Sequence, residues 1–257
     1  MAVTSTFIDN TKIDANQTVY TFSNHAIGTA SADRYVVVGV GGRGGADKSV
    51  SSVTVGGTSL TELVELKAFV NTSALWWGNI TTGTTADIVV TWDSSGRTGT
   101  GIGVYTLTGV DGTVSDTASD SDANGTDAAS INLTVPAGGA VIATNKAGGL
   151  ISASTWTWTG VTEDFEQTIE IDNTQTAAND EFAGAQSPLV VTVAPNQSDQ
   201  KVLVGASFTA AAAGTNAQIN IGDSWKAISA MQINIGDVWK PVAGAQVNIG
   251  DAWKTIF

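Results

Sequence analysis

Cysteine is absent from this 257-residue chain, and histidine occurs once, as His25. Without cysteine the fold needs no disulfide bonds and is compatible with assembly in a reducing cytosol. One histidine leaves little material for nucleophilic catalysis, and no G-x-S-x-G element accompanies it. We therefore expect a fold held by its core alone and no Ser–His–acid hydrolase.

Basic residues are also scarce, because 11 Lys and Arg stand against 24 Asp and Glu, a formal net charge of −13. Nucleic acids and anionic membranes bind clustered positive charge, so we expect neither as a partner. No apolar run approaches the roughly 20 residues of a membrane helix. Residues 1–6 lack the basic start and apolar stretch of a signal peptide, so we expect no export by that route.

The abundant residues are Val, Thr, Ile, Ala, Gly, Ser and Asn, a composition typical of short strands joined by tight turns. Residues 17–22 alternate in polarity, and residues 35–40 are typical of a buried central strand. About a dozen such segments are separated by turn signals such as Gly56-Gly57 and Asp111-Gly112. This pattern predicts an all-β fold with a jelly-roll-type β-sandwich over residues 1–208.

Residues 209–217 are rich in alanine and are predicted to form a linker. Residues 218–257 then hold three copies of a 14-residue repeat. Each copy has a Gly-Asp pair between two β-prone runs, which predicts a hairpin with a two-residue turn. In the first copy this register pairs Ile221 with Ser224 and Asn220 with Trp225.

Each predicted hairpin carries aliphatic residues on one face and tryptophan on the other, so it cannot bury both faces alone. The repeats therefore predict either an assembly element, with a homotrimer as the expected oligomer, or a small meander packed on its own domain. Their three Asp and three Lys cancel, so the −13 belongs to the rest of the chain. The candidate interface residues are Ile219, Ile221, Trp225, Ile233, Ile235, Trp239, Val247, Ile249 and Trp253.

Two motifs suggest ligands but lack part of their usual context. Gly39, Gly41 and Gly44 match a dinucleotide fingerprint, but β-prone residues follow in place of a helix, which favours a flexible loop with Arg43 at its tip. Asp120, Asp122 and Asn124 match the start of a calcium loop, but Ile131 stands where the bidentate Glu belongs. We expect no metal and no cofactor.

Acidic and aromatic residues provide the remaining candidates. Alternation places Asp164, Glu166, Glu170 and Asp172, next to Glu163, on a solvated strand face opposite Phe165, which argues against a glycosidase pair.

Trp156 and Trp158 share a strand face, for which core filling is the favoured interpretation, and the pair is also the leading candidate for a glycan platform. The adjacent Trp76 and Trp77 point to opposite faces, so at most one is expected in the core.

The repeats resemble the IxxGDxWK elements near the ends of many phage tail and virion proteins. The likeness is carried by Trp225-Lys226, Trp239-Lys240 and Trp253-Lys254. Residues from about 34 to 208 resemble a concanavalin-like or jelly-roll sandwich of bacterial surface and phage virion proteins. The matching segments are residues 35–40, 53–60, 75–79, 88–92, 103–110 and 161–163.

This resemblance implies a non-enzymatic structural or adhesive protein of a bacteriophage particle, as a head decoration or a tail tip or fibre component. It implies other virion proteins as partners, a position on the virion surface after assembly in the host cytoplasm, and host-surface glycan as a further candidate partner. A carbohydrate-binding module of a bacterial surface protein is the alternative, and a polysaccharide-degrading enzyme is a third.

Overall fold

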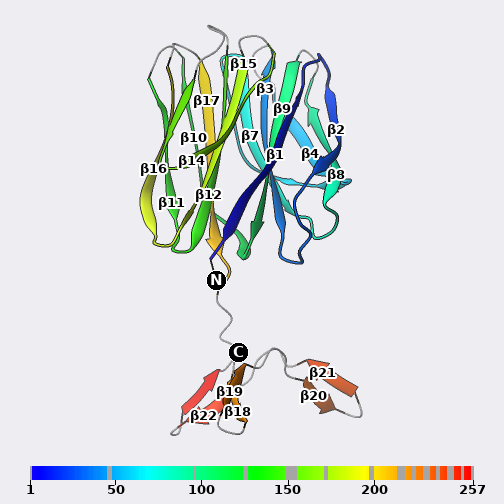
Figure 1. Cartoon of the computed structure of the whole chain (residues 1–257), viewed down its shortest axis with the longest axis vertical. Coiled ribbons are helices and arrows are strands. Elements are labelled where there is room, and N and C mark those ends of the chain that lie inside the picture. Colours follow the sequence, from blue (N-terminus) through cyan, green and yellow to red (C-terminus); the bar gives the residue numbers. More distant parts are fainter. Residues whose placement is uncertain are drawn as a thin grey trace. The chain divides into compact units, whose positions relative to one another are not determined.

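The computed structural model describes residues 2–44, 48–94, 97–123, 127–148, 155–170, 173–196 and 200–212, and the backbone of residues 218–221, 224–227, 232–235, 238–241, 246–249 and 252–255. The chain divides into two compact units, Met1–Ala211, here called the body, and Ala212–Phe257, the hairpin array. Every regular element in the described residues is a β-strand (Figure 1). The predicted all-β, sandwich-type fold is confirmed.

The body consists of two consecutive repeats of strands. The first contains β1 (Thr4–Ile13), β2 (Val19–Ala26), β3 (Tyr35–Gly44), β4 (Val50–Val55), β5 (Thr58–Ser59), β6 (Thr61–Ala68), β7 (Asn71–Asn79), β8 (Thr85–Trp92) and β9 (Arg97–Thr108). The second contains β10 (Val110–Asp122), β11 (Ala129–Val135), β12 (Gly139–Gly148), β13 (Trp156–Thr159), β14 (Thr162–Thr168), β15 (Asn173–Phe182), β16 (Gln186–Pro195) and β17 (Lys201–Ala210).

The two repeats have the same topology. Sheet A has the order β1-β9-β3-β7-β6 and sheet C the order β10-β17-β12-β15-β14. Sheet B has the order β2-β8-β4-β5 and sheet D the order β11-β16-β13. Apart from β5, the strands of one repeat therefore correspond one by one to those of the other. The equivalent pairs are β1 and β10, β2 and β11, β3 and β12, β4 and β13, β6 and β14, β7 and β15, β8 and β16, and β9 and β17. The body is thus an internal duplication of one sandwich.

The duplication also leaves a short trace in the sequence, which the strand patterns alone do not predict. The run Thr61-Glu62-Leu63-Val64-Glu65 of β6 matches Thr162-Glu163-Asp164-Phe165-Glu166 of β14 at a separation of 101 residues. Both runs shift register at their third residue, which forms a β-bulge against the neighbouring strand. Shared identity at a shared bulge supports a common origin for the two halves.

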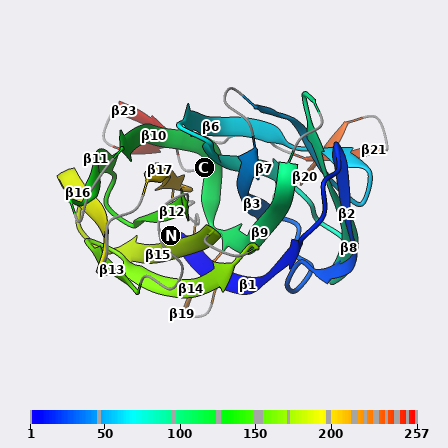
Figure 2. The same ribbon diagram turned by 90° about the horizontal axis from the view of Figure 1, so that it is seen from above.

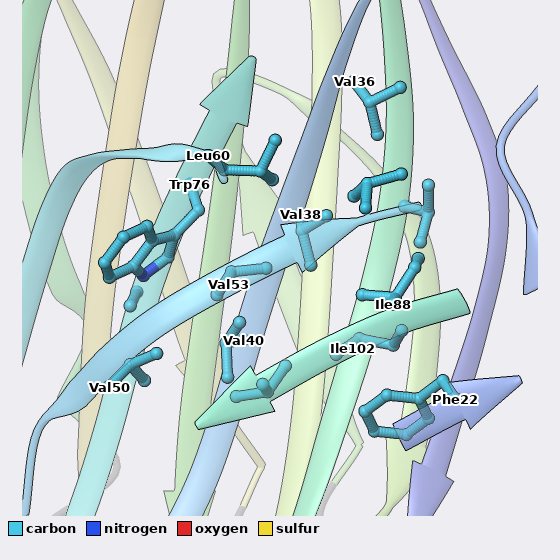
Figure 3. Packing of buried hydrophobic residues seen from close by; sticks show 14 of the residues in the cluster. Phe22, Val36, Val38, Val40, Val50, Val53, Leu60, Trp76, Ile88 and Ile102 are labelled. Atoms are coloured by element: carbon cyan, nitrogen blue, oxygen red, sulfur yellow. The ribbon is translucent and has the colours of Figure 1, made fainter. Parts of the chain in front are cut away.

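The four sheets form successive layers in the order B, A, C, D, with three apolar cores between them. Figure 3 shows the A/B core, where Val38, Val53 and Ile88 converge from three strands. The valine run of β3 serves two cores, because Val36 and Val38 face sheet B while Val37 packs in the A/C core. A strand that is buried on both faces has a continuous apolar run, as residues 35–40 do.

Sheets A and C pack with opposite strand orders. At one margin β6 lies beside β10, and at the other β1 lies beside β14 (Figure 2). The A/C core fills the space between these margins with Val37, Leu75, Leu107, Ile142, Val204 and Phe208, among other residues. Each margin therefore joins a strand of the first repeat to a strand of the second.

The hairpin array contains three separate two-stranded sheets. Their strands are β18 (Gln218–Ile221), β19 (Ser224–Ala227), β20 (Gln232–Ile235), β21 (Val238–Pro241), β22 (Gln246–Ile249) and β23 (Ala252–Thr255). The predicted register is confirmed, since Ile221 pairs with Ser224 and Asn220 with Trp225, and the other two copies repeat it. The side chains of the nine candidate interface residues lie outside the described ones, so that interface stays a prediction. β17 extends to Ala210, into the segment predicted as a linker.

Candidate functional site

A cleft of about 490 Å³ opens at the margin where β6 meets β10. Sheet A contributes Thr61, Glu62, Leu63 and Trp77, and β10 contributes Val114–Thr117. The cleft thus depends on the contact between the two repeats. Neither repeat alone supplies both walls.

Trp77 is the aromatic residue of the cleft, and it is held firmly. Its ring stacks on Tyr35 at a centroid separation of 4.6 Å and contacts Phe208 at 5.4 Å. The residue remains 8% exposed. The ring is thus fixed by other aromatic groups while part of its surface reaches the cleft.

The opposite margin, between β1 and β14, is closed by polar contacts. Asn179, in the orientation that satisfies both ends of its amide, donates to both carboxylate oxygens of Asp164 at 3.0 and 3.1 Å and accepts from Ser5 Oγ at 2.8 Å. Tyr105 Oη donates to Asp164 Oδ2 at 3.0 Å. Strands β14, β15, β1 and β9 are tied together here.

The two margins correspond through the duplication. Thr61 pairs with Trp77, and its equivalent, Thr162, pairs with Asn179. Leu63 likewise corresponds to the bulged Asp164. An aliphatic and an aromatic residue at the open margin are therefore replaced by a carboxylate and an amide at the closed one.

Burial raises the pKa of Asp164 to about 6; the Tyr105 hydrogen bond acts in the opposite direction, and the Asp180 charge adds to the increase. Burial likewise raises the pKa of Glu163 and of Glu166. The prediction of an ordinary solvated face was wrong for Asp164, because the bulge breaks the alternation and turns this carboxylate toward Tyr105. Glu170 follows the end of β14, and its backbone N–H donates to Asp14 Oδ1. Asp172 lies outside the described residues.

The tryptophans predicted as a glycan platform are core residues. Trp156 is 6% and Trp158 is 9% exposed, and both belong to the C/D core. This burial confirms core filling, the favoured interpretation, and argues against the glycan platform, since both rings pack among the apolar residues of that core. Trp76 and Trp77 are both buried, one in the A/B core and one in the A/C core. The expectation that at most one would be buried was wrong because sheet A is covered on both sides.

The glycine motif forms part of a strand. Gly39, Gly41 and Gly44 lie within β3, so the predicted flexible loop was wrong. A Cβ at Gly41 would lie 2.9 Å from the side chain of Gln175, and one at Gly42 would lie 2.5 Å from the ring of Trp92. The glycines of β3 therefore admit side chains from the layers on both sides.

The calcium candidates have protein partners. Asp120 Oδ2 accepts from the backbone N–H of Ser130 at 2.8 Å, and Asp122 Oδ2 contacts the buried Nζ of Lys201 at 2.5 Å. Both acids lie in β10, where the backbone is extended, and Asn124 lies outside the described residues. No group of three or more His, Asp or Glu residues in the described part of the chain is arranged to hold a metal ion.

The single histidine, His25, lies in β2 and is largely buried. Its Nδ1 lies 3.1 Å from the Ala26 carbonyl oxygen, and its Nε2 lies 3.8 Å from Asp9 Oδ2. These contacts link β1 to β2.

No protein-family model matches the chain, and no curated protein is significantly similar to it. Within the residues that the structure describes, no helix is long and apolar enough to cross a membrane.

Proposed function

We propose that the chain is a non-enzymatic structural and adhesive protein on the surface of a bacteriophage particle, as a head decoration or a tail tip or fibre component. The observation that supports this most is the hairpin array, a separate compact unit of three hairpins with the same register that carry the IxxGDxWK repeat. Repeats of this kind resemble elements near the ends of phage tail and virion proteins, and this resemblance is the basis of the proposal.

The distribution of formal charge supports different roles for the body and the hairpin array. The array has three Asp and three Lys and no net charge, whereas the rest of the chain carries −13. A neutral element with tryptophan and aliphatic residues suits contact with other virion proteins and with copies of itself. The acidic body suits the displayed, solvated role. The protein is then on the virion surface after assembly in the host cytoplasm, with a trimer as the proposed oligomer.

Labelling of particles tests this proposal. Antibodies raised against residues 2–211 should label intact particles in lysates of the bacterium that carries the gene, and capsid or tail genes should adjoin that gene. Absence of the chain from purified particles would sink the virion role. It would leave the alternative, a carbohydrate-binding module of a bacterial surface protein.

A further inference from the structure

We propose that the cleft between β6 and β10 binds a neutral or amino-bearing saccharide unit of a cell-surface polysaccharide. This inference rests on the adhesive part of the proposed function and assigns a site to it. The site is distinct from Trp156 and Trp158, which the structure places in the C/D core.

The first argument is the pairing of a fixed aromatic ring with a polar wall. Trp77 lines the cleft with the 8% of its surface that stays exposed, and its ring is held in place by Tyr35 and Phe208, so this small apolar surface is preorganised. Leu63 extends this surface. The C–H groups of a pyranose ring form an apolar patch that packs on such a surface, and a preorganised site loses less entropy on binding.

The second argument is the supply of hydrogen-bonding groups around that surface. The two walls carry exposed residues with hydroxyl groups, namely Thr61, Ser115 and Thr117. Glu62 adds an exposed carboxylate. Hydroxyls both donate and accept, and a carboxylate accepts, which matches the hydroxyl groups of a sugar. The lining thus combines apolar residues with polar groups that can fix the orientation of a ligand, as the linings of small-molecule sites do.

The β10 wall is itself preorganised. Asp116 Oδ1 accepts from the backbone N–H of Thr117 at 2.9 Å, and Asp116 Oδ2 accepts from that of Thr134 at 2.8 Å. The second bond anchors β10 to the neighbouring strand β11. Ser115 stands at a register shift between Val114 and Asp116, which turns this stretch of β10 out of the regular pleat.

Charge restricts the class of saccharide. The residues that line the cleft include Glu62 and Asp116 and contain no lysine or arginine. A phosphorylated, sulfated or uronic sugar would meet like charge at the site and from a body of formal charge −13. A neutral sugar meets no such repulsion, and an amino group gains attraction.

The third argument comes from the duplication. The fold does not require this cleft, because the equivalent margin at β1 and β14 is closed by Asn179, Asp164, Ser5 and Tyr105. One of two related margins retains an open cleft with an aromatic residue at the position where the other has an amide. A difference of this kind between two copies of one structure indicates a function specific to the open copy.

The test is binding of the full-length protein to immobilised oligosaccharides, followed by titration calorimetry. The probes are chitotetraose, maltotetraose, galactotetraose and de-acetylated chitotetraose, with a hyaluronan tetrasaccharide as the anionic comparison. We expect at least one neutral or amino-bearing probe to bind, and the anionic probe not to bind. Absence of binding to all four neutral and amino probes, or preference for hyaluronan, would overturn the proposal.

Two exposed substitutions localise the site. Ser115→Arg places a large side chain in the cleft, whereas Thr6→Arg makes the same kind of change at an exposed position on β1, at the closed margin. We expect Ser115→Arg to weaken binding at least tenfold and Thr6→Arg to leave it unchanged. Equal affinity in the two variants would place the ligand elsewhere and refute the cleft. A chain that ends at Ala211 should bind the same probe, so failure of the cleft and failure of the virion role are separate results.

Discussion

Among the side chains that the structure describes, Arg34 is the largest charged one that is completely buried, and its partners are backbone carbonyl groups. Its guanidinium donates to the carbonyl oxygens of Ile80, Ile27, Gly28, Gly83 and Thr82 at 2.7–3.2 Å. The planar fork of one arginine thus fixes the segment that follows β2 to the segment that follows β7. A planar group with five donors can satisfy several carbonyls at once, which an ammonium group cannot do in the same geometry.

We expect Arg34→Met to lower the free energy of unfolding by about 3 kcal/mol, because several carbonyl groups lose their donor while the aliphatic stem is kept. Arg34→Lys should fall between the wild type and Arg34→Met, since it keeps the charge and loses the fork. Urea unfolding followed by tryptophan fluorescence measures both. A change below about 0.5 kcal/mol for Arg34→Met would contradict this assignment.

Asp164 should make the stability of the body depend on pH. Its pKa is about 6 in the folded chain, above an unfolded value near 3.9. The folded state therefore holds the proton more tightly, so the stabilisation is complete below about pH 4 and is lost as the pH rises through 6. Because Asp164 is partly exposed, solvent screening reduces the effect to the order of 1 kcal/mol.

Asp164→Asn removes this titration and keeps an acceptor for Tyr105. We expect the variant to be more stable than the wild type at pH 7.5, with no gain at pH 4, in urea unfolding at both pH values. Glu62→Gln, at an exposed position on β6, is the control and should not flatten the profile. An unchanged pH profile in Asp164→Asn would show that other groups, such as Glu163, cause the dependence.

At the scale of the element, β3 is constrained by side chains from the sheets on both of its faces. The ring of Trp92 approaches Gly42 so closely that even a methyl group there must displace it. We expect Gly42→Ala to cost about 1–3 kcal/mol through overpacking. Gly184→Ala, at a position with no neighbour within 4 Å of the added Cβ, is the matched control and should be nearly neutral. Denaturant midpoints of the two variants decide the point, and equal values would refute the packing argument.

Elements with strong local signals were predictable, and those set by other layers were not. The Gly-Asp turn alone fixes the register of each hairpin, so Ile221 and Ser224 were paired correctly. Alternation failed at Asp164 because a bulge depends on the partner strand. It failed at Trp77 because burial on both faces depends on a second sheet. Period-two patterns describe one strand and contain no information about the number of layers.

The cleft could not be predicted by reading segments one at a time. Its walls come from residues 61–63 and 77 of one repeat and residues 114–117 of the other. The available signal was the repeated T-E-x-x-E run of β6 and β14, whose separation of 101 residues indicates two similar domains. Recognition of that repeat would have predicted a contact surface between two copies, which is where the cleft lies.

At the scale of the whole molecule, we expect the hairpin array to determine the oligomeric state. The sequence predicts that each hairpin needs cover on both faces, which closed three-fold symmetry would supply. Light scattering at micromolar concentration should give a trimer for the full chain and a monomer for a chain that ends at Ala211. If both chains are monomers, the array is not an oligomerisation element of the free protein. A trimeric truncated chain would instead assign self-association to the body.

The body begins and ends beside the residue that joins its two repeats. A Cβ at Gly109 would lie 2.5 Å from the Ala2 carbonyl oxygen, and the Ala211 N–H donates to the Gly109 carbonyl oxygen at 2.7 Å. The order of the two halves along the gene is therefore not required by their packing. A circularly permuted body that starts at Val110 and joins Ala211 to Ala2 through a short glycine linker should fold to the same four layers. The molecule that gave rise to it by gene fusion would then have been a dimer of two separate single-sandwich chains.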